Sequence, residues 1–141
     1  MRAVVDASVA VALFVDQPLS ETAAAALAEY DFAAPTLILA EIGNAFWKYS
    51  RANRMPEEKL AAARERLEKG MIACSELTPA AAWSALRLAV DLDHPIYDCF
   101  YLALSKELRA PLITADRRLA GAAARAGVDL VDLDVLEGQT P

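Results

Sequence analysis

Short apolar runs alternate with longer helical patterns along the chain. The first run, 2–5, carries two valines and is followed at once by a carboxylate, Asp6. The apolar stretch then resumes through Val15 and is too long and too rich in alanine for a second strand. We therefore predict a buried strand, a sharp turn at Asp6, and a helix that begins near Ser8.

The same alternation continues to the end of the sequence. Predicted helices cover residues 8–15, 20–30, 37–53, 57–69, 80–91, 96–108 and 117–126; further strands are predicted at 31–34, 71–77, 112–114 and 128–133, and a polar tail at 137–141. Strand 31–34 is expected to be a brief edge strand, and Ser20, Thr36 and Thr78 are expected to cap helices. Short strands separated by helices predict a parallel α/β sheet within a single domain, residues 1–141.

Composition narrows the class of protein. Of the 141 residues, 56% are hydrophobic, and the net charge of −6 disfavours a broad basic surface for nucleic acid but leaves room for a local one. Cys74 and Cys99 fit neither a disulfide framework nor a metal-site spacing, so we expect a reducing cytoplasm. Asp6 and Asp16 interrupt the first apolar run, so neither a signal peptide nor a membrane span is expected.

Four carboxylates stand where their neighbours are mostly apolar. Asp6 and Asp116 each follow a predicted strand, whereas Glu41 and Asp98 lie in apolar stretches of predicted helices. In parallel sheets the ligand site lies outside the carboxyl ends of the strands. Because converging carboxylates repel one another and are costly to bury unpaired, we expect a hard divalent cation between them, Mg²⁺ or Mn²⁺.

Each acid also has a purely structural explanation. Asp6 and Asp116 each precede a predicted helix and are suited to cap its N-terminus. Asp98 falls in the first turn of its helix, where the dipole stabilises a negative charge. Glu41 is explained equally well by a position at the solvent edge. The four together favour one shared site, because a sheet of this order gathers them at one edge.

Polar neighbours of these acids are candidates for supporting roles. Ser8 and Thr114 each lie two residues from a strand-end acid and are expected to cap a helix or donate a hydrogen bond to the carboxylate. Asn44 shares a helix face with Glu41 and is expected to steady it or to contact substrate. The only histidine, His94, lies in a predicted turn and is expected to be structural or exposed.

Basic residues near the acids are candidate phosphate contacts. Two groups qualify, the row Lys48, Arg51 and Arg54 and the pair Arg117 and Arg118. An ordinary solvated helix face explains the first group equally well.

Four motifs carry a resemblance to a known family. They are Asp6-Ala7-Ser8 at a strand end, Glu41 with Asn44 in a helix, the segment Asp-His-Pro-Ile-Tyr-Asp-Cys-Phe-Tyr-Leu-Ala at 93–103, and Thr114-Ala115-Asp116. In order and spacing, over nearly the whole chain, they resemble PIN-domain ribonucleases, and more closely the VapC toxins of type II toxin–antitoxin systems. The last two motifs together are the most specific.

The resemblance implies a three-layer α/β fold with a parallel sheet of order 3-2-1-4-5 flanked by about seven helices. It implies a Mg²⁺-dependent endoribonuclease whose catalytic acids are Asp6, Glu41, Asp98 and Asp116. The metal would lie on Asp6, Asp98 and Asp116, with supporting or substrate contacts from Ser8, Asn44, Thr114 and Arg117. It also implies a homodimer and a cognate antitoxin that lays its C-terminal segment across the site. Some relatives carry a further acid after the last motif where this chain has Arg117, Arg118 and Leu119, so the number of metal ions stays open.

Three rival classes are weighed against this one. A haloacid-dehalogenase-like phosphatase would use Asp6 as nucleophile and needs a second Asp where Ser8 stands. A response-regulator receiver needs a lysine at the end of the last strand, and 128–133 contains none. A non-catalytic PIN-like interaction module does not require all four acids, which this chain retains.

Overall fold

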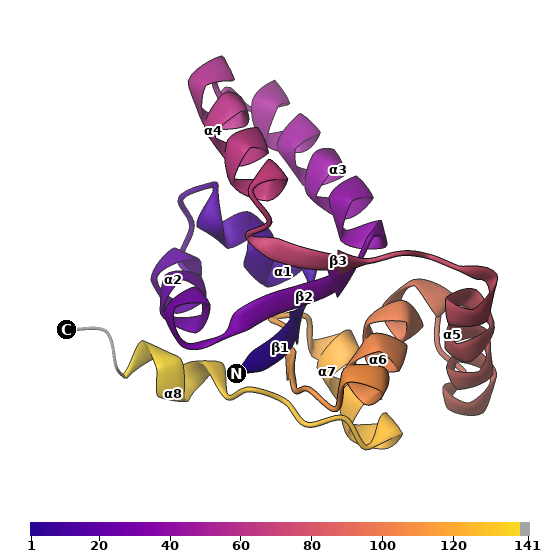
Figure 1. The fold of residues 1–141 in the computed structure, drawn as a ribbon. Coiled ribbons are helices and arrows are strands. Elements are labelled where there is room, and N and C mark those ends of the chain that lie inside the picture. The colour runs from indigo at the N-terminus through magenta and orange to yellow at the C-terminus, as the bar shows by residue number, and fades with distance from the viewer. Residues whose placement is uncertain (139–141) are drawn as a thin grey trace.

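Four parallel strands form the central sheet, in the spatial order β3-β2-β1-β4 (Figure 1). They are β1 (Arg2–Val5), β2 (Asp31–Pro35), β3 (Ile72–Ser75) and β4 (Leu112–Ile113). The computed structural model describes residues 1–138, so 139–141 of the predicted polar tail lie outside the described residues.

The fifth strand predicted at 128–133 is wrong. A single bridge between Leu112 and Leu130 holds this segment beside β4, where the Leu112 amide donates to the carbonyl of Asp129 over 2.8 Å. The Asp132 carboxylate then accepts a hydrogen bond from the Asp134 amide and starts helix α8 (Leu133–Glu137). The sheet order is therefore 3-2-1-4, because an aspartate cap turns the chain into a helix after one bridge.

Strand β2 is interior rather than the edge strand predicted. It pairs with β1 on one side and with β3 on the other, and Phe32 through Pro35 are buried. Pro35 lies beyond the last residue of β2 that pairs with β1, Ala33, so no hydrogen bond of that ladder needs the amide proton that proline lacks. The edge position belongs to β3, where Ala73 and Cys74 are exposed.

Eight α-helices accompany the sheet within residues 1–138. They are α1 (Ala7–Ala10), α2 (Ser20–Glu29), α3 (Leu37–Arg51), α4 (Glu57–Glu68), α5 (Pro79–Leu92), α6 (Ile96–Leu108), α7 (Arg117–Ala126) and α8, and the 3₁₀ helix η1 (Val11–Leu13) continues α1. The first predicted helix is thus split in two, the other six are present, and α8 is additional to the seven expected.

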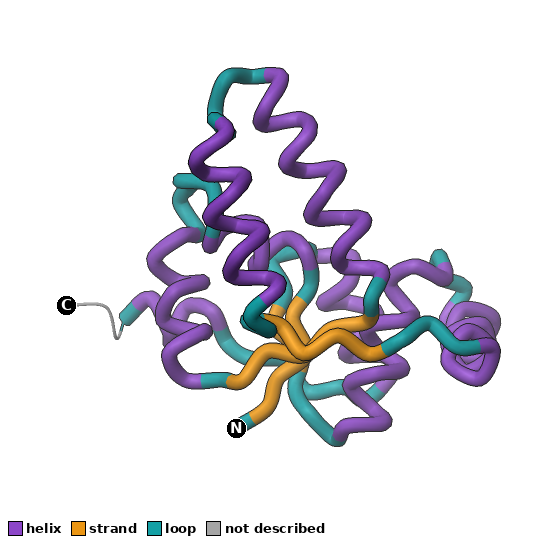
Figure 2. Tube along the Cα trace, turned by 45° about the horizontal axis from the view of Figure 1, so that its top comes forward, coloured by secondary structure: helices purple, strands orange, loops and turns teal. Residues whose placement is uncertain are grey.

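The direction of the crossovers assigns the helices to the two faces of the sheet. The chain steps from β1 to β2 to β3 in one direction, so right-handed connections place α1 to α4 on one face. The return from β3 to β4 places α5 and α6 on the other, where α6 packs against β1, β2 and β4. Figures 1 and 2 show this division, with α3 and α4 projecting as a pair from one side.

Helix ends follow the sequence signals only in part. The Thr78 hydroxyl accepts a hydrogen bond from the amide of Ala81 and caps α5, as predicted. Thr36 makes no side-chain cap bond. Ser20 is the first residue of α2 rather than its cap, and its hydroxyl donates to the carbonyl of Val15 instead. Among the described residues, no helix combines the length and apolarity needed to cross a membrane.

Candidate active site

The ends of β1 and β4 meet at one edge of the sheet. Val5 pairs with Ile113, and the Asp6 amide donates to the Ile113 carbonyl over 3.2 Å. This register places Asp6 beside Thr114, although 108 residues separate them. The prediction that the two strand-end motifs share one edge is confirmed by this pairing.

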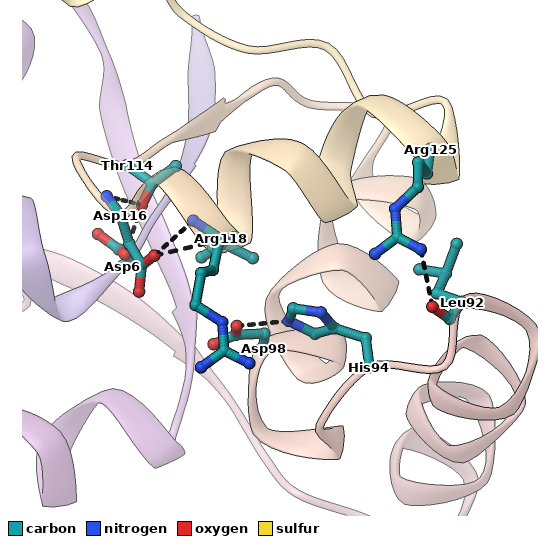
Figure 3. A network of polar contacts seen from close by, with 9 residues as sticks. Asp6, Leu92, His94, Asp98, Thr114, Asp116, Arg118 and Arg125 are labelled. Atoms are coloured by element: carbon teal, nitrogen blue, oxygen red, sulfur yellow. Dashed lines mark hydrogen bonds and ion pairs between the residues drawn. The ribbon is translucent and has the colours of Figure 1, made fainter.

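Asp6 is held by neutral donors on both carboxylate oxygens. The Ser8 hydroxyl donates to Oδ1 and the Thr114 hydroxyl to Oδ2, each over 2.6 Å, and the Val9 amide adds a longer bond of 3.4 Å to Oδ1 (Figure 3 shows the Asp6 and Thr114 side). The structural role weighed for Asp6, a cap of the first helix, is therefore real. The expected hydrogen bonds from Ser8 and Thr114 are also present.

Burial dominates the electrostatics of Asp6. The residue is 6% exposed, and desolvation raises the pKa of its carboxyl to about 6, against the lowering effect of the hydroxyl and amide donors. The negative charge of Glu41 raises this pKa further. None of the described residues forms an ion pair with Asp6. Asp6 is thus a buried acid without a cationic partner.

Glu41 reaches the same region from the second turn of α3. Its Oε1 accepts a hydrogen bond of 2.6 Å from the hydroxyl of Tyr101, a buried residue of α6. Burial raises the pKa of Glu41, the Tyr101 bond lowers it, and the charge of Asp98 raises it again. Burial and the Glu41 bond raise the pKa of Tyr101, so this hydroxyl stays a donor.

Asp98 is positioned by the histidine that sequence reasoning set aside. The side chain of His94 is only 7% exposed, and its Nε2 lies 2.7 Å from Oδ2 of Asp98, which is 30% exposed (Figure 3). The acid lies in the first turn of α6, as its structural explanation required. The expectation that His94 is structural is correct, but its partner is one of the four candidate acids.

Asp116 caps α7 and joins the network through the backbone. Its Oδ1 accepts hydrogen bonds from the amides of Arg118 and Leu119, over 2.8 and 3.3 Å. Its own amide donates to the Thr114 hydroxyl over 3.0 Å, the same hydroxyl that holds Asp6 (Figure 3). The side chain of Asp116 is exposed, in contrast to that of Asp6.

The structure thus gathers the four acids around one edge of the sheet, but they do not form a complete set of metal ligands. Charge coupling joins Asp6 to Glu41 and Glu41 to Asp98, and Thr114 joins Asp6 to Asp116. Within residues 1–138, no group of three Asp, Glu, His or Cys side chains stands ready to hold a metal ion. A shared cation would require these side chains to move from this arrangement.

A cavity of about 690 Å³ opens beside these acids. Ser8, Glu41 and Ala115 form its inner wall, and Asn44 and Lys48 of α3 also line it. The shared helix face predicted for Glu41 and Asn44 is confirmed, although Asn44 makes no hydrogen bond to Glu41.

The two groups of basic residues differ in how free they are. Arg51 stacks on Trp47 at 5.1 Å, and Arg54 lies 4.9 Å from the ring of Tyr49 while donating to the carbonyl of Asp16. Lys48 is exposed and has no such contact with any residue in 1–138. Arg117 and Arg118 are both exposed at the start of α7, and in the view of Figure 3 the Arg118 side chain extends in the direction of Asp98.

Sequence reasoning missed two residues of this site. The spacing of His94 and Asp98, four residues apart, is that of facing residues on a helix, but His94 lies before α6 begins at Ile96. Tyr101 lies on the buried side of α6, and nothing in its neighbourhood along the chain points to Glu41, 60 residues away.

Comparison with known proteins places the chain in a family. The family model described as PIN domain matches residues 3–125. This chain is a PIN-domain protein. Ribonuclease VapC3 of Pyrobaculum aerophilum is 33% identical over 123 residues, which cover 85% of this chain and 93% of that protein. The resemblance inferred from the motifs is therefore confirmed.

Solved structures agree with this PIN-domain fold. PAE2754 from Pyrobaculum aerophilum has a TM-score of 0.67 at 25% identity, over 99% of this chain and 97% of that one. FitAcB from Neisseria gonorrhoeae has a TM-score of 0.62 at 20% identity, over 93% and 97% of the two chains. A toxin–antitoxin complex from Klebsiella pneumoniae has a TM-score of 0.60 at 18% identity, over 81% and 86%. The last two likenesses establish the fold alone.

Proposed function

We propose that this PIN-domain protein is a metal-dependent endoribonuclease and the toxin of a toxin–antitoxin pair, acting in the cytoplasm. The observation that carries the proposal is the buried carboxylate of Asp6, which has only neutral donors and lies within the field of Glu41. Such a group is stabilised by a bound cation. Membership of the family and the ribonuclease name of the relative at 33% identity support the same activity.

The donor set fits Mg²⁺, with Mn²⁺ as the alternative. The candidate ligands are carboxylate oxygens, which both ions prefer over the nitrogen and sulfur ligands typical of zinc. Asp6 and Asp98 would hold the ion most directly, and Asp116 and Glu41 would complete its surroundings through water. When bound, the ion supplies charge neutralisation and acidifies a water molecule.

The chain's own residues orient the acids and manage protons. Ser8 and Thr114 fix the Asp6 carboxylate, His94 fixes Asp98, and Tyr101 fixes Glu41. A raised pKa makes Glu41 a better proton acceptor for an attacking water than an ordinary carboxylate.

The reaction is a hydrolysis of the RNA backbone. Water adds to phosphorus as the bond from phosphorus to O3′ breaks, which leaves a 5′-phosphate and a 3′-hydroxyl. Arg117, exposed beside Asp116, is placed to contact a phosphate of the RNA backbone.

The alternative of a phosphatase with Asp6 as nucleophile is less well supported. Both oxygens of Asp6 accept hydroxyl hydrogen bonds of 2.6 Å, which lowers their nucleophilicity and restricts an in-line approach to phosphorus. A non-catalytic interaction module would leave unexplained why four supporting side chains, those of Ser8, Thr114, His94 and Tyr101, hold the acids in place.

The decisive experiment compares Asp6→Asn with Asp91→Asn, the same change at an exposed position of α5. A partner of a metal ligand is worth about 10–100-fold in activity, so loss of a direct ligand should lower RNA cleavage by more than about 100-fold. Wild type and Asp91→Asn should cleave with Mg²⁺ or Mn²⁺ and not with EDTA. Calorimetric titration with Mn²⁺ should show binding that Asp6→Asn loses. Undiminished cleavage by Asp6→Asn would contradict the proposal.

The toxin role has its own test. Expression of the wild-type chain in bacteria should arrest growth, Asp6→Asn should not, and co-expression of the protein encoded beside this gene should restore growth. Solution mass measurement would show whether the chain is the homodimer that the family resemblance implies. Arrest by Asp6→Asn as strong as by wild type would separate toxicity from hydrolysis.

A further inference from the structure

The cavity beside the acids has an outer wall that the hydrolytic chemistry does not use. Gln17, from the turn before α2, and Asn44, Lys48 and Tyr49 of α3 form this wall, which we call the outer wall. The inner wall contains Ser8 and is thus continuous with the catalytic acids. A ligand in this cavity would contact Glu41, one of the four acids, and Ser8, whose hydroxyl donates to Asp6.

Contacts between the end of α3 and the turn before α2 hold the backbone of the outer wall in place. Arg54 covers one face of the Tyr49 ring and donates to the carbonyl of Asp16, which ties the end of α3 to the turn that carries Gln17. The Ser20 hydroxyl accepts a hydrogen bond from the Gln17 amide over 3.0 Å. The backbone that carries Gln17 and the ring of Tyr49 are therefore preformed, as in most binding pockets.

The polar side chains of the outer wall make no hydrogen bonds with other described residues. Across residues 1–138, neither the carboxamides of Gln17 and Asn44 nor the ammonium group of Lys48 has a hydrogen bond or ion pair within the chain. The nearby acids differ, since Asp6, Glu41, Asp98 and Asp116 all accept hydrogen bonds. Asn44 and Lys48 are exposed and Gln17 is half-buried, so all three polar groups are open to a ligand that enters the cavity.

The chemistry of the wall matches a nucleotide. A carboxamide offers both donor and acceptor, as the edge of a nucleobase does, and a lysine contacts phosphate. A volume of about 690 Å³ is ample for one nucleotide, and single-stranded RNA is read mainly through unstacked bases held in such pockets. A bound peptide would make less use of two carboxamides and a cation around one small cavity.

We propose that this cavity holds the nucleotide next to the scissile phosphate, with Gln17 and Asn44 reading its base and Lys48 contacting its phosphate. The inference rests on the proposed ribonuclease function and adds to it a base preference on one side of the cut. It makes Gln17, Asn44 and Lys48 specificity-determining residues rather than catalytic ones.

The first test needs no variant and no cleavage. The chain has only four side-chain carboxamides, those of Gln17, Asn44, Asn53 and Gln139, so their NH₂ signals are few and assignable by NMR. In EDTA, titration with each of the four ribonucleoside 5′-monophosphates should shift the signals of Gln17 and Asn44, with at least one base stronger than the others. Asn53 serves as internal control. Absent shifts at Gln17 and Asn44 would overturn the proposal and leave the cavity to a protein partner or to solvent, and equal shifts for all four nucleotides would overturn the base reading.

The second test reads the base preference from cleavage products. On a randomised RNA pool, the double variant Gln17→Ala/Asn44→Ala should flatten the preference at one position beside the cut, and kcat/KM on the preferred sequence should fall about tenfold or more. The matched control for the double variant is Ser50→Ala, which is exposed on the same helix. Lys48→Gln removes the charge proposed to contact phosphate, and its charge control is Lys59→Gln. An unchanged preference with normal cleavage would defeat this inference alone, whereas absence of cleavage by wild type would defeat the ribonuclease proposal.

Discussion

The ends of β1 and β4 follow one local pattern and produce two different acids. At each end an aspartate follows the strand closely and caps the next helix, Asp6 through the Val9 amide and Asp116 through the amides of Arg118 and Leu119. Yet Asp6 is 6% exposed and Asp116 is open to solvent. The local motif therefore does not determine how deeply the carboxylate is buried.

Position in the sheet explains the difference. Strand β1 is paired on both sides, and the residue after it is enclosed by Ser8, Val9 and Thr114. Strand β4 has two residues and only the Leu130 bridge on its outer side, so the chain there is open. We infer that the two acids have different roles. The buried Asp6 carboxylate needs a cation to stabilise its charge, and the exposed Asp116 side chain can move to contact that cation.

The largest effect expected from this difference is on stability at neutral pH. A pKa raised from 3.8 to about 6 corresponds to about 3 kcal/mol. The folded state binds more protons at Asp6 than the unfolded state between these values, so this contribution to the free energy of unfolding falls as pH rises from about 4 to about 6. In EDTA, Asp6→Asn should therefore gain about 3 kcal/mol on wild type between pH 3 and pH 7.

Urea unfolding at both pH values measures this gain, with Asp91→Asn as the matched control. Addition of Mn²⁺ at pH 7 should stabilise wild type and not Asp6→Asn. A difference between wild type and Asp6→Asn that stays constant with pH would show that the burial of Asp6 does not carry the cost assigned to it.

The next effect falls on the residue that links the two strand ends. Thr114→Val removes the donor to Asp6 and the acceptor for the Asp116 amide while keeping the shape of the side chain. We expect about 10–100-fold weaker Mn²⁺ binding and slower cleavage, the usual effect of losing a group that orients a metal ligand. Thr114→Ser keeps the hydroxyl and should retain most of the activity. Equal losses in both variants would point to packing rather than to the hydroxyl.

The smallest effect separates capping from chemistry at Asp116. Asp116→Ala should lower the free energy of unfolding by about 1 kcal/mol, as loss of an N-cap does. Thr78→Ala removes the cap of α5 and should cost a similar amount, but it should leave cleavage intact. Chemical denaturation and cleavage assays on both variants give the comparison. If Asp116→Ala cleaves RNA as well as Thr78→Ala, then Asp116 is a cap and nothing more.

Sequence reasoning succeeded where neighbouring strands end together. The run 2–5 and the run before Thr114 are apolar, stop at polar residues, and precede helices, so their meeting at one edge could be anticipated. The catalytic roles of the four acids remain predictions, although the structure brings the acids to the same region.

It failed where the outcome depended on the partner strand. The sequence of residues 128–133 is compatible with a strand or with a segment that leads into a helix. Because β4 has only two residues, it offers this segment little to pair with, and Asp132 caps α8 instead. Likewise, the apolar residues of β2 do not reveal whether β1 and β3 flank them. The contact from Tyr101 to Glu41 depends on the packing of α6 against the sheet, which no local pattern encodes.

The Thr114 hydroxyl has a consequence for the order of events during synthesis. Thr114 is synthesised long after Asp6, Ser8 and Glu41. Until it is made, the Asp6 carboxylate lacks one of its two hydroxyl donors. A nascent chain therefore carries an unassembled centre while its own message is still being translated. If the protein cuts RNA, its topology postpones that ability until the segment that carries Thr114 has been made.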